Sequence, residues 1–215
     1  VSGGVFCIDA SELTNLNEIG YFETSQGPQI FTVSDGTGHI VDRTLGLISL
    51  PVSSSLIPPK KVLETYGGII SANKILMRGK FMYLAGGSGL HIYSANDCFE
   101  NSWDKLGSFR WSTDVQEMCI EGDLVYCVLS NSSLIVLNVS NPFEVRKVSQ
   151  FDNSGLKITW TMEKIGQYLY LACGDRGAII LKVNAEGELA LECVFEGSTE
   201  NCTAFRVEGN RGYLL

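Results

Sequence analysis

A glycine followed four residues later by a tyrosine recurs along the chain at a nearly constant interval. The pattern stands at Gly122 and Tyr126. Its copies are Gly79 with Tyr83, Gly166 with Tyr170, and Gly209 with Tyr213. The glycines follow one another at intervals of 43, 44 and 43 residues. A fixed period of this length is typical of propeller blades or of paired-helix repeats.

Two further markers keep the same interval. A small residue opens an apolar run ten or eleven residues after the glycine, as at Gly89 and Ser133. An aromatic residue closes a polar-rich stretch at Phe22, Tyr66, Phe109, Phe151 and Phe195. Because no stretch of a dozen residues shows apolar residues at helical spacing, the markers predict strands and not paired helices.

The repeat predicts an all-β chain that folds as a β-propeller of four-stranded blades, with about 43 residues per blade. We expect a single propeller domain over residues 1–215, with a half blade at 1–24, blades at 25–67, 68–111, 112–153 and 154–197, and a half blade at 198–215. These five blade-equivalents form either a closed five-bladed ring or a fragment of a six- or seven-bladed ring. The missing initial Met favours the fragment.

Each part of the unit has an expected place in the blade. The two middle strands should be continuously apolar because neighbouring blades cover both of their faces, and Tyr168 to Cys173 has this character. The fourth strand should be mixed, as Val145 to Phe151 is. The recurring glycine marks a tight hairpin between the first two strands, and the tyrosine should pack between blades. Pro51, Pro58 and Pro59 predict a connection, since proline supplies no ladder donor.

Composition excludes some partner classes. The net charge of -8 and the pI near 4.8 argue against a nucleic-acid surface, which needs clustered basic residues. No apolar run reaches the roughly 20 residues of a spanning helix, so no membrane span is expected in this segment.

The cysteines and the asparagines point to different compartments. Five of the seven cysteines lie in expected strands, which indicates free structural thiols and a reducing, cytoplasmic compartment. These five are Cys7, Cys119, Cys127, Cys173 and Cys193. Glycosylation-type triplets begin at Asn131, Asn138 and Asn201 and favour an extracellular one. The compartment therefore stays open.

One unit resembles a known repeat family. The only Trp-Asp pair, Trp103-Asp104, is expected in a loop and the Gly-Gly pair occurs once, so neither tryptophan-aspartate nor kelch repeats fit. Residues 134–142 read Leu-Ile-Val-Leu-Asn-Val-Ser-Asn-Pro and are followed by a polar strand and Phe151. This segment resembles the LVIVD repeat, most clearly over residues 133–151. The resemblance implies a propeller, often on bacterial secreted or cell-surface proteins, and brings no catalytic motif.

Searches for chemistry give few candidates. His39 and His91 each lie inside an expected strand and are interpreted as packing or rim residues. Ser88 stands between glycines, but Leu90 occupies the position where a nucleophile elbow needs glycine. No cofactor and no metal site are expected.

Ligands of propellers usually meet the loops that join second to third strands and fourth to next first strands. The polar residues of these loops are the candidate ligand-binding residues: Asp42, Arg43, Asp114, Asp152, Asp175, Arg176, Glu200 and Asn201. Asp175 and Arg176 are the first choice for mutation, because the glycines beside them let a backbone approach a ligand.

Three functions are compatible with this pattern. The preferred one is a non-catalytic interaction module that presents loops to a protein or glycan partner, as part of a larger secreted or surface protein. The second is a propeller hydrolase or lyase that acts through paired carboxylates in an axial pocket. The third is a purely structural repeat segment. Because no catalytic constellation clusters in the sequence, we expect the chain not to be an enzyme.

Overall fold

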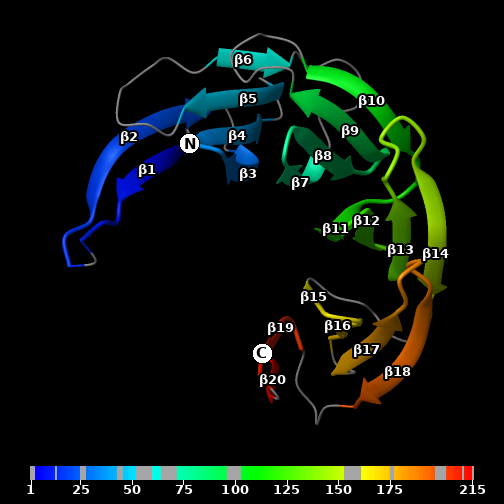
Figure 1. Ribbon diagram of the computed structural model, residues 1–215. Coiled ribbons are helices and arrows are strands. Elements are labelled where there is room, and N and C mark those ends of the chain that lie inside the picture. The colour runs from blue at the N-terminus through cyan, green and yellow to red at the C-terminus, as the bar shows by residue number, and fades with distance from the viewer. Residues whose placement is uncertain are drawn as a thin grey trace. The chain divides into compact units, whose positions relative to one another are not determined.

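A computed structural model describes residues 3–12, 14–24, 28–42, 46–51, 60–63, 72–95, 103–152, 161–174, 177–196, 202–209 and 211–214 (Figure 1). Within these ranges the secondary structure consists of strands and turns, and no helix occurs. The chain divides into two compact units, Val1–Leu106 and Gly107–Leu215. The all-β prediction is confirmed.

The first unit begins with a two-stranded sheet and continues with four-stranded antiparallel sheets. The two-stranded sheet pairs β1 (Gly3–Asp9) with β2 (Asn17–Thr24). The next sheet has the order β3 (Pro28–Ser34), β4 (Thr37–Asp42), β5 (Gly46–Pro51) and β6 (Lys60–Leu63). The third has the order β7 (Ala72–Arg78), β8 (Phe81–Gly86), β9 (Gly89–Ala95) and β10 (Trp103–Phe109), and β10 extends past the end of the unit.

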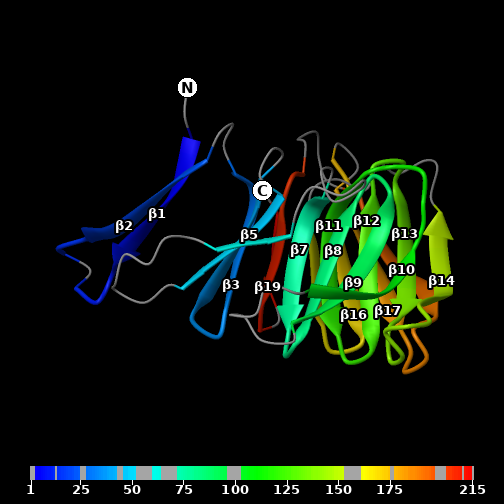
Figure 2. The ribbon, with the colours of Figure 1, turned by 90° about the horizontal axis from the view of Figure 1, so that it is seen from above.

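The second unit repeats this arrangement. One four-stranded sheet contains β11 (Val115–Glu121), β12 (Leu124–Leu129), β13 (Ser133–Asn138) and β14 (Arg146–Asp152). The next contains β15 (Met162–Ile165), β16 (Tyr168–Ala172), β17 (Ala178–Val183) and β18 (Leu189–Phe195). A pair, β19 (Phe205–Glu208) and β20 (Arg211–Leu214), follows. Within each four-stranded sheet the strands lie side by side in chain order (Figure 1). Figure 2 shows the same ribbon from above.

The recurring glycine closes the hairpin between the first two strands, as the sequence predicts. Gly122 has a φ of 56° and Gly166 a φ of 54°, a left-handed conformation that a side chain would strain. The equivalent glycines of the other hairpins, Gly36, Gly79 and Gly209, also have positive φ. The hairpin is therefore a property of the repeat and not of one sheet.

Burial follows the order of the strands. In β12 and β13 every residue except the one at the hairpin or loop end is buried, whereas β14 contains only exposed and partly buried residues. Tyr126 and Val128 from one sheet form a single apolar cluster with Leu169 and Leu171 from the next. Consecutive sheets of the second unit thus bury their faces against each other, the packing expected of blades.

The first unit packs its two four-stranded sheets in the same way. Val41 and Leu47 from β4 and β5 share a cluster with Ile75, Met82 and Leu84 from β7 and β8. These side chains are at most 4% exposed. The first unit thus also buries the faces of consecutive sheets against each other.

Three details differ from the expectation. Trp103 and Asp104 begin β10 instead of lying in a loop, because the Trp103 ring is buried, edge-on to His39 with ring centroids 5.6 Å apart. Pro51 is the last residue of β5, an end position that tolerates a missing donor, while Pro58 and Pro59 lie outside the described residues. Cys173 follows β16 directly and is buried there.

His39 is a packing residue, as predicted, and it links pH to stability. The side chain is 1% exposed in β4, and its Nδ1 lies 2.7 Å from Ser49 Oγ of β5. Burial disfavours the charged imidazolium and lowers the pKa of His39 from 6.5.

We expect the free energy of unfolding to fall as pH is lowered from about 7 toward 5. Below the ordinary histidine pKa, His39 takes up a proton in the unfolded chain but not in the folded protein. The free energy of unfolding therefore decreases as the pH falls from the ordinary pKa to the lowered pKa of the folded state. One proton sets a limit of about 1.4 kcal/mol per pH unit. Urea unfolding at both pH values measures the loss, and His39→Gln, which can keep a bond to Ser49, should show less of it. Equal losses would contradict a shifted His39 pKa.

Candidate functional site

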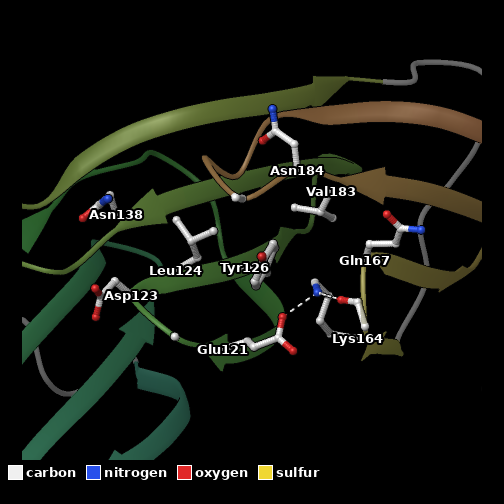
Figure 3. Close-up of a pocket in the computed structure, with 12 residues that line it drawn as sticks. Glu121, Asp123, Leu124, Tyr126, Asn138, Lys164, Gln167, Val183 and Asn184 are labelled. Carbon is white, nitrogen blue, oxygen red and sulfur yellow. Dashed lines mark hydrogen bonds and ion pairs between the residues drawn. The ribbon is translucent and has the colours of Figure 1, made fainter.

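A pocket of about 480 Å³ lies between the two four-stranded sheets of the second unit (Figure 3). The β11–β12 and β15–β16 hairpins form one part of it, and the ends of β13 and β17 form another. The lining residues are Glu121, Gly122, Asp123, Leu124, Tyr126, Asn138, Lys164, Gly166, Gln167, Val183, Asn184 and Ala185. The glycine hairpin that defines the repeat therefore also builds the pocket.

An ion pair between a largely buried ammonium and an exposed carboxylate joins the two hairpins, since the Glu121 side chain is 53% exposed. Lys164 Nζ lies 2.5 Å from Glu121 Oε2, and the Lys164 side chain is 7% exposed. The ammonium also donates to the backbone carbonyl of Gly166. It lies 5.7 Å from the centroid of the Tyr126 ring, within the range of a cation–π contact. Three groups of the protein, the Glu121 carboxylate, the Gly166 carbonyl and the Tyr126 ring, thus interact favourably with the positive charge of Lys164.

Tyr126 contributes a protonated hydroxyl to this pocket. The residue is 1% exposed, and its ring belongs to the cluster between the sheets. Burial, followed by the neighbouring Glu121 carboxylate and the Cys119 thiol, raises the pKa of Tyr126 to about 12. At neutral pH the hydroxyl therefore keeps its proton and can donate as well as accept a hydrogen bond.

Asn138 ends β13 and Asn184 directly follows β17, and the turn bonds of both asparagines hold them at the pocket. Asn138 Oδ1 accepts bonds from Ser140 N at 2.9 Å and from Ser140 Oγ at 2.7 Å. Asn184 Oδ1 accepts from Glu188 N at 2.8 Å, and its Nδ2 donates to Glu188 Oε2 at 2.9 Å. The acceptor of Asn138 is thus occupied by its own turn, whereas these bonds leave its two N–H donors unused.

The predicted loop candidates lie elsewhere. Asp114 precedes β11 and Asp152 ends β14, so both lie at the end of this sheet opposite the pocket. Asp42 ends β4 in the first unit and is buried, not presented to solvent. Arg43, Asp175, Arg176, Glu200 and Asn201 lie outside the described residues.

The loop end that carries Asp114 and Asp152 is held by side-chain hydrogen bonds. Gln150 Nε2 lies 2.7 Å from Asp152 Oδ2, and the hydroxyl of Ser133 also bonds to this carboxylate. These two bonds, Ser133 first, lower the pKa of Asp152. The hydroxyl oxygens of Thr113 and Ser130 lie 2.6 Å apart, and Ser130 N donates to the carbonyl of Asp114 at 2.8 Å. Asp152 is exposed and presents an ordered negative charge.

Cys127 and Cys173 are buried, and Cys119 is partly buried. Burial is the main cause that raises the pKa of Cys119 and of Cys173 to about 12, and it raises that of Cys127 further. A thiol must ionise to act as a nucleophile, so these three are inert at neutral pH. Free thiols are present at all six described cysteines, while Cys98 lies outside the described residues. Among the residues that the structure describes, no cluster of metal-ligating side chains occurs.

One segment of the chain matches a known repeat family. Residues 112–152 match the LVIVD repeat, and this range contains the whole sheet β11–β14. The resemblance noted in the sequence is therefore confirmed for that segment. Its Ser-Asn-Pro part forms consecutive turns, since Asn141 Oδ1 accepts from Phe143 N at 3.2 Å after the Asn138 turn. No curated protein matches the chain in sequence.

Solved structures show the same type of fold at low identity. A putative 6-phosphogluconolactonase from Bacteroides uniformis matches 98% of this chain and 69% of its own, with a TM-score of 0.72 and 14% identity. The computationally designed Ika8 protein matches 86% of this chain with a TM-score of 0.66 and 8% identity, and Saccharomyces cerevisiae Sqt1 matches 63% with a TM-score of 0.53 and 14% identity. This chain spans 54% of the length of Ika8 and 38% of that of Sqt1.

These likenesses concern the fold alone. Together with the stacked four-stranded sheets, they fit a propeller-type protein. Among the described residues, no helix has the length and apolar character to cross a membrane. The LVIVD match identifies one segment of the chain.

Proposed function

We propose that the chain is a non-catalytic interaction module of the propeller type that presents its loops to a protein or glycan partner. The main support for this proposal is the loop end of the sheet β11–β14, where hydrogen bonds from Ser133 and Gln150 hold the exposed Asp152 carboxylate in place. A rigid sheet with buried middle strands positions such groups without a folding cost on binding. Exposed, fixed polar groups can then recognise a partner surface.

The ionisation of the described groups supports a role without catalysis. General acids and bases work best with a pKa near the working pH. Asp152 has a lowered pKa, so its carboxylate stays ionised and can accept hydrogen bonds but cannot supply a proton at neutral pH. Cys119 and Cys173 have a pKa of about 12, which keeps their thiols protonated.

The test compares how partner binding changes when carboxylates are removed at one end of the sheets or at the other. The purified chain is applied to an array of immobilised glycans and extracellular proteins, and the double variant Asp114→Asn, Asp152→Asn is applied alongside. We expect bound spots to weaken at least about tenfold in the double variant, since it removes both charges while each Asn keeps one acceptor oxygen. The control is Glu144→Gln with Glu186→Gln, two exposed carboxylates at the opposite end. Equal binding by both variants, or no binding by the wild type, contradicts the proposal.

An enzymatic role has one specific observation in its favour, the likeness to the putative 6-phosphogluconolactonase over 98% of the chain. Incubation of the purified chain with 6-phosphogluconolactone tests it. We expect hydrolysis at the spontaneous rate. Turnover above that rate that is lost in the Asp114 and Asp152 variants would replace the binding module with a hydrolase.

We propose further that residues 1–215 form one propeller domain of five blade-equivalents. The recurrence of the same hairpin and strand order in successive sheets supports this. The blades belong either to a closed five-bladed ring or to a six- or seven-bladed one. The neighbouring sequence on both sides decides the blade number, and small-angle scattering of the corresponding protein checks it.

A further inference from the structure

The pocket between the two hairpins of the second unit lies at the opposite end of β11–β14 from the loops of the proposed function. We propose that it binds a small neutral polyhydroxylated ligand, namely a monosaccharide or disaccharide unit. Its volume of about 480 Å³ is that of an ordinary small-ligand site, about 300–1,000 Å³. This site does not depend on the loop end, so either can exist without the other.

Charge compensation selects a neutral ligand. Among the described residues that line the pocket, Lys164 is the only cationic one, and it is paired with Glu121 at 2.5 Å and bonded to Gly166. An anion would have to compete with the Glu121 carboxylate and the Gly166 carbonyl for an ammonium whose side chain is 7% exposed. A cation would meet Asp123 and the second oxygen of Glu121, and both residues are exposed, so water and salt screen their charges. The pocket therefore favours a neutral polar ligand, which needs no charged partner, over an anion or a cation.

Unused hydrogen-bonding capacity selects hydroxyl groups. Asn138 offers two N–H donors, because its oxygen is occupied by Ser140. The Tyr126 hydroxyl can donate and accept. Gln167 donates through Nε2 to Tyr168 at 3.3 Å, which leaves its carbonyl oxygen as an acceptor, and Glu121 has a second carboxylate oxygen. A mixed set of donors and acceptors matches a ligand whose hydroxyls each donate and accept.

An apolar wall completes the match. Leu124, Val183 and Ala185 line the same pocket, and Figure 3 shows Leu124 and Val183 on the two sides of Tyr126. Sugar rings present C–H faces as well as hydroxyls, and burial of such faces against apolar side chains is favourable. The polar groups then fix the orientation of the ring, as in other small-ligand sites.

The experiment is a titration of the folded chain followed by NMR of its backbone amides. The probes are D-glucose, D-galactose, D-mannose, N-acetylglucosamine, maltose and lactose, each raised to millimolar concentrations. We expect at least one sugar to give saturable shifts centred on the turns at Gly122 and Gly166. Sodium acetate and methylammonium chloride, the ionic probes, should leave these amides unchanged.

Two conservative variants locate the bonds. Asn138→Asp keeps the oxygen that holds Ser140 and removes the two donors, and Tyr126→Phe keeps the ring and removes the hydroxyl. Each should weaken sugar binding roughly tenfold, the effect of one net hydrogen bond. The matched controls are Asn131→Asp, whose oxygen makes a similar turn bond to Ser133 N outside the pocket, and Tyr170→Phe, the equivalent tyrosine stacked on Phe205. The controls should bind as the wild type does.

Several results would overturn the proposal. These are the absence of shifts with every sugar, shifts caused by acetate or methylammonium instead, and sugar shifts that Asn138→Asp and Asn131→Asp reduce equally. Sugar shifts confined to the Asp114 and Asp152 end would place the ligand at the loop end. That result would leave the proposed function standing and remove this pocket.

Discussion

Leu171→Ala is expected to lower the free energy of unfolding by about 2–5 kcal/mol. Leu171 is in β16, is 0% exposed, and belongs to the apolar cluster that joins two consecutive sheets of the second unit. Removal of its side chain beyond Cβ loses the transfer free energy of those atoms and leaves a cavity between the two sheets. The hydrogen bonds between the strands of each sheet limit how far the sheets can close this cavity. Equilibrium unfolding in urea, followed by circular dichroism, measures the loss.

Leu191→Ala provides the matched control in the same repeat. Leu191 lies in the fourth strand, β18, pairs with Leu181, and is 52% exposed. Its truncation should change stability by no more than about 0.5–1 kcal/mol. If the two variants lost equal stability, the distinction between buried inner strands and a wet outer strand would be wrong for this chain.

The same distinction could be predicted from the sequence because it depends on local patterns. A continuous apolar run such as Leu134 to Leu137 needs cover on both faces, and a tight hairpin needs glycine at its left-handed position. Both requirements depend on a few neighbouring residues, so they can be recognised in a single copy of the repeat. The other copies then confirm the positions of the strands within the repeat. The strand order and the buried middle strands follow from them.

The pocket could not be predicted in this way, because its ion pair joins residues one repeat apart. Glu121 and Lys164 are separated by 43 positions and meet only through the packing of one sheet on the next. No spacing rule within a single unit brings a carboxylate to that ammonium. The one available signal was the tyrosine beside the hairpin, and sequence reasoning assigned Tyr126 to packing between blades. Its ring does pack there, while its hydroxyl side faces the pocket.

Loop charges are equally hard to place from sequence. Asp42 and Asp152 both end a strand, yet Asp42 is buried and Asp152 is exposed. The difference depends on which segments cover each strand end, and local composition does not encode it. The irregular pairing at Val136/Leu137, repeated at Ile180/Leu181, is another such feature, since an extra residue bends the fourth strand without any change in apolar pattern.

A close backbone contact in the LVIVD segment gives the second large expected effect. Gly107, in β10, lies so near the loop after β13 that a Cβ atom would be 2.2 Å from the carbonyl oxygen of Pro142 and 3.3 Å from the carbonyl carbon of Phe143. Both partners are backbone atoms and cannot rotate away. The Asn141 bond to Phe143 N further restrains this loop. The proline of the Ser-Asn-Pro segment therefore packs closely against a strand, β10, of another sheet.

Gly107→Ala should therefore destabilise the protein by about 1–3 kcal/mol, the usual cost of a forced backbone shift. Because Gly107 does not have a positive φ, an alanine is conformationally allowed there and the effect is one of contact alone. Gly20→Ala is the control, since its Cβ would meet Cys7 Cβ at an ordinary 3.8 Å and should change stability by less than about 1 kcal/mol. Urea unfolding gives the two free energies, and amide shifts of residues 141–144 report the displaced loop. An unchanged midpoint together with unchanged shifts for Gly107→Ala would mean that the Pro142 carbonyl does not pack on this strand.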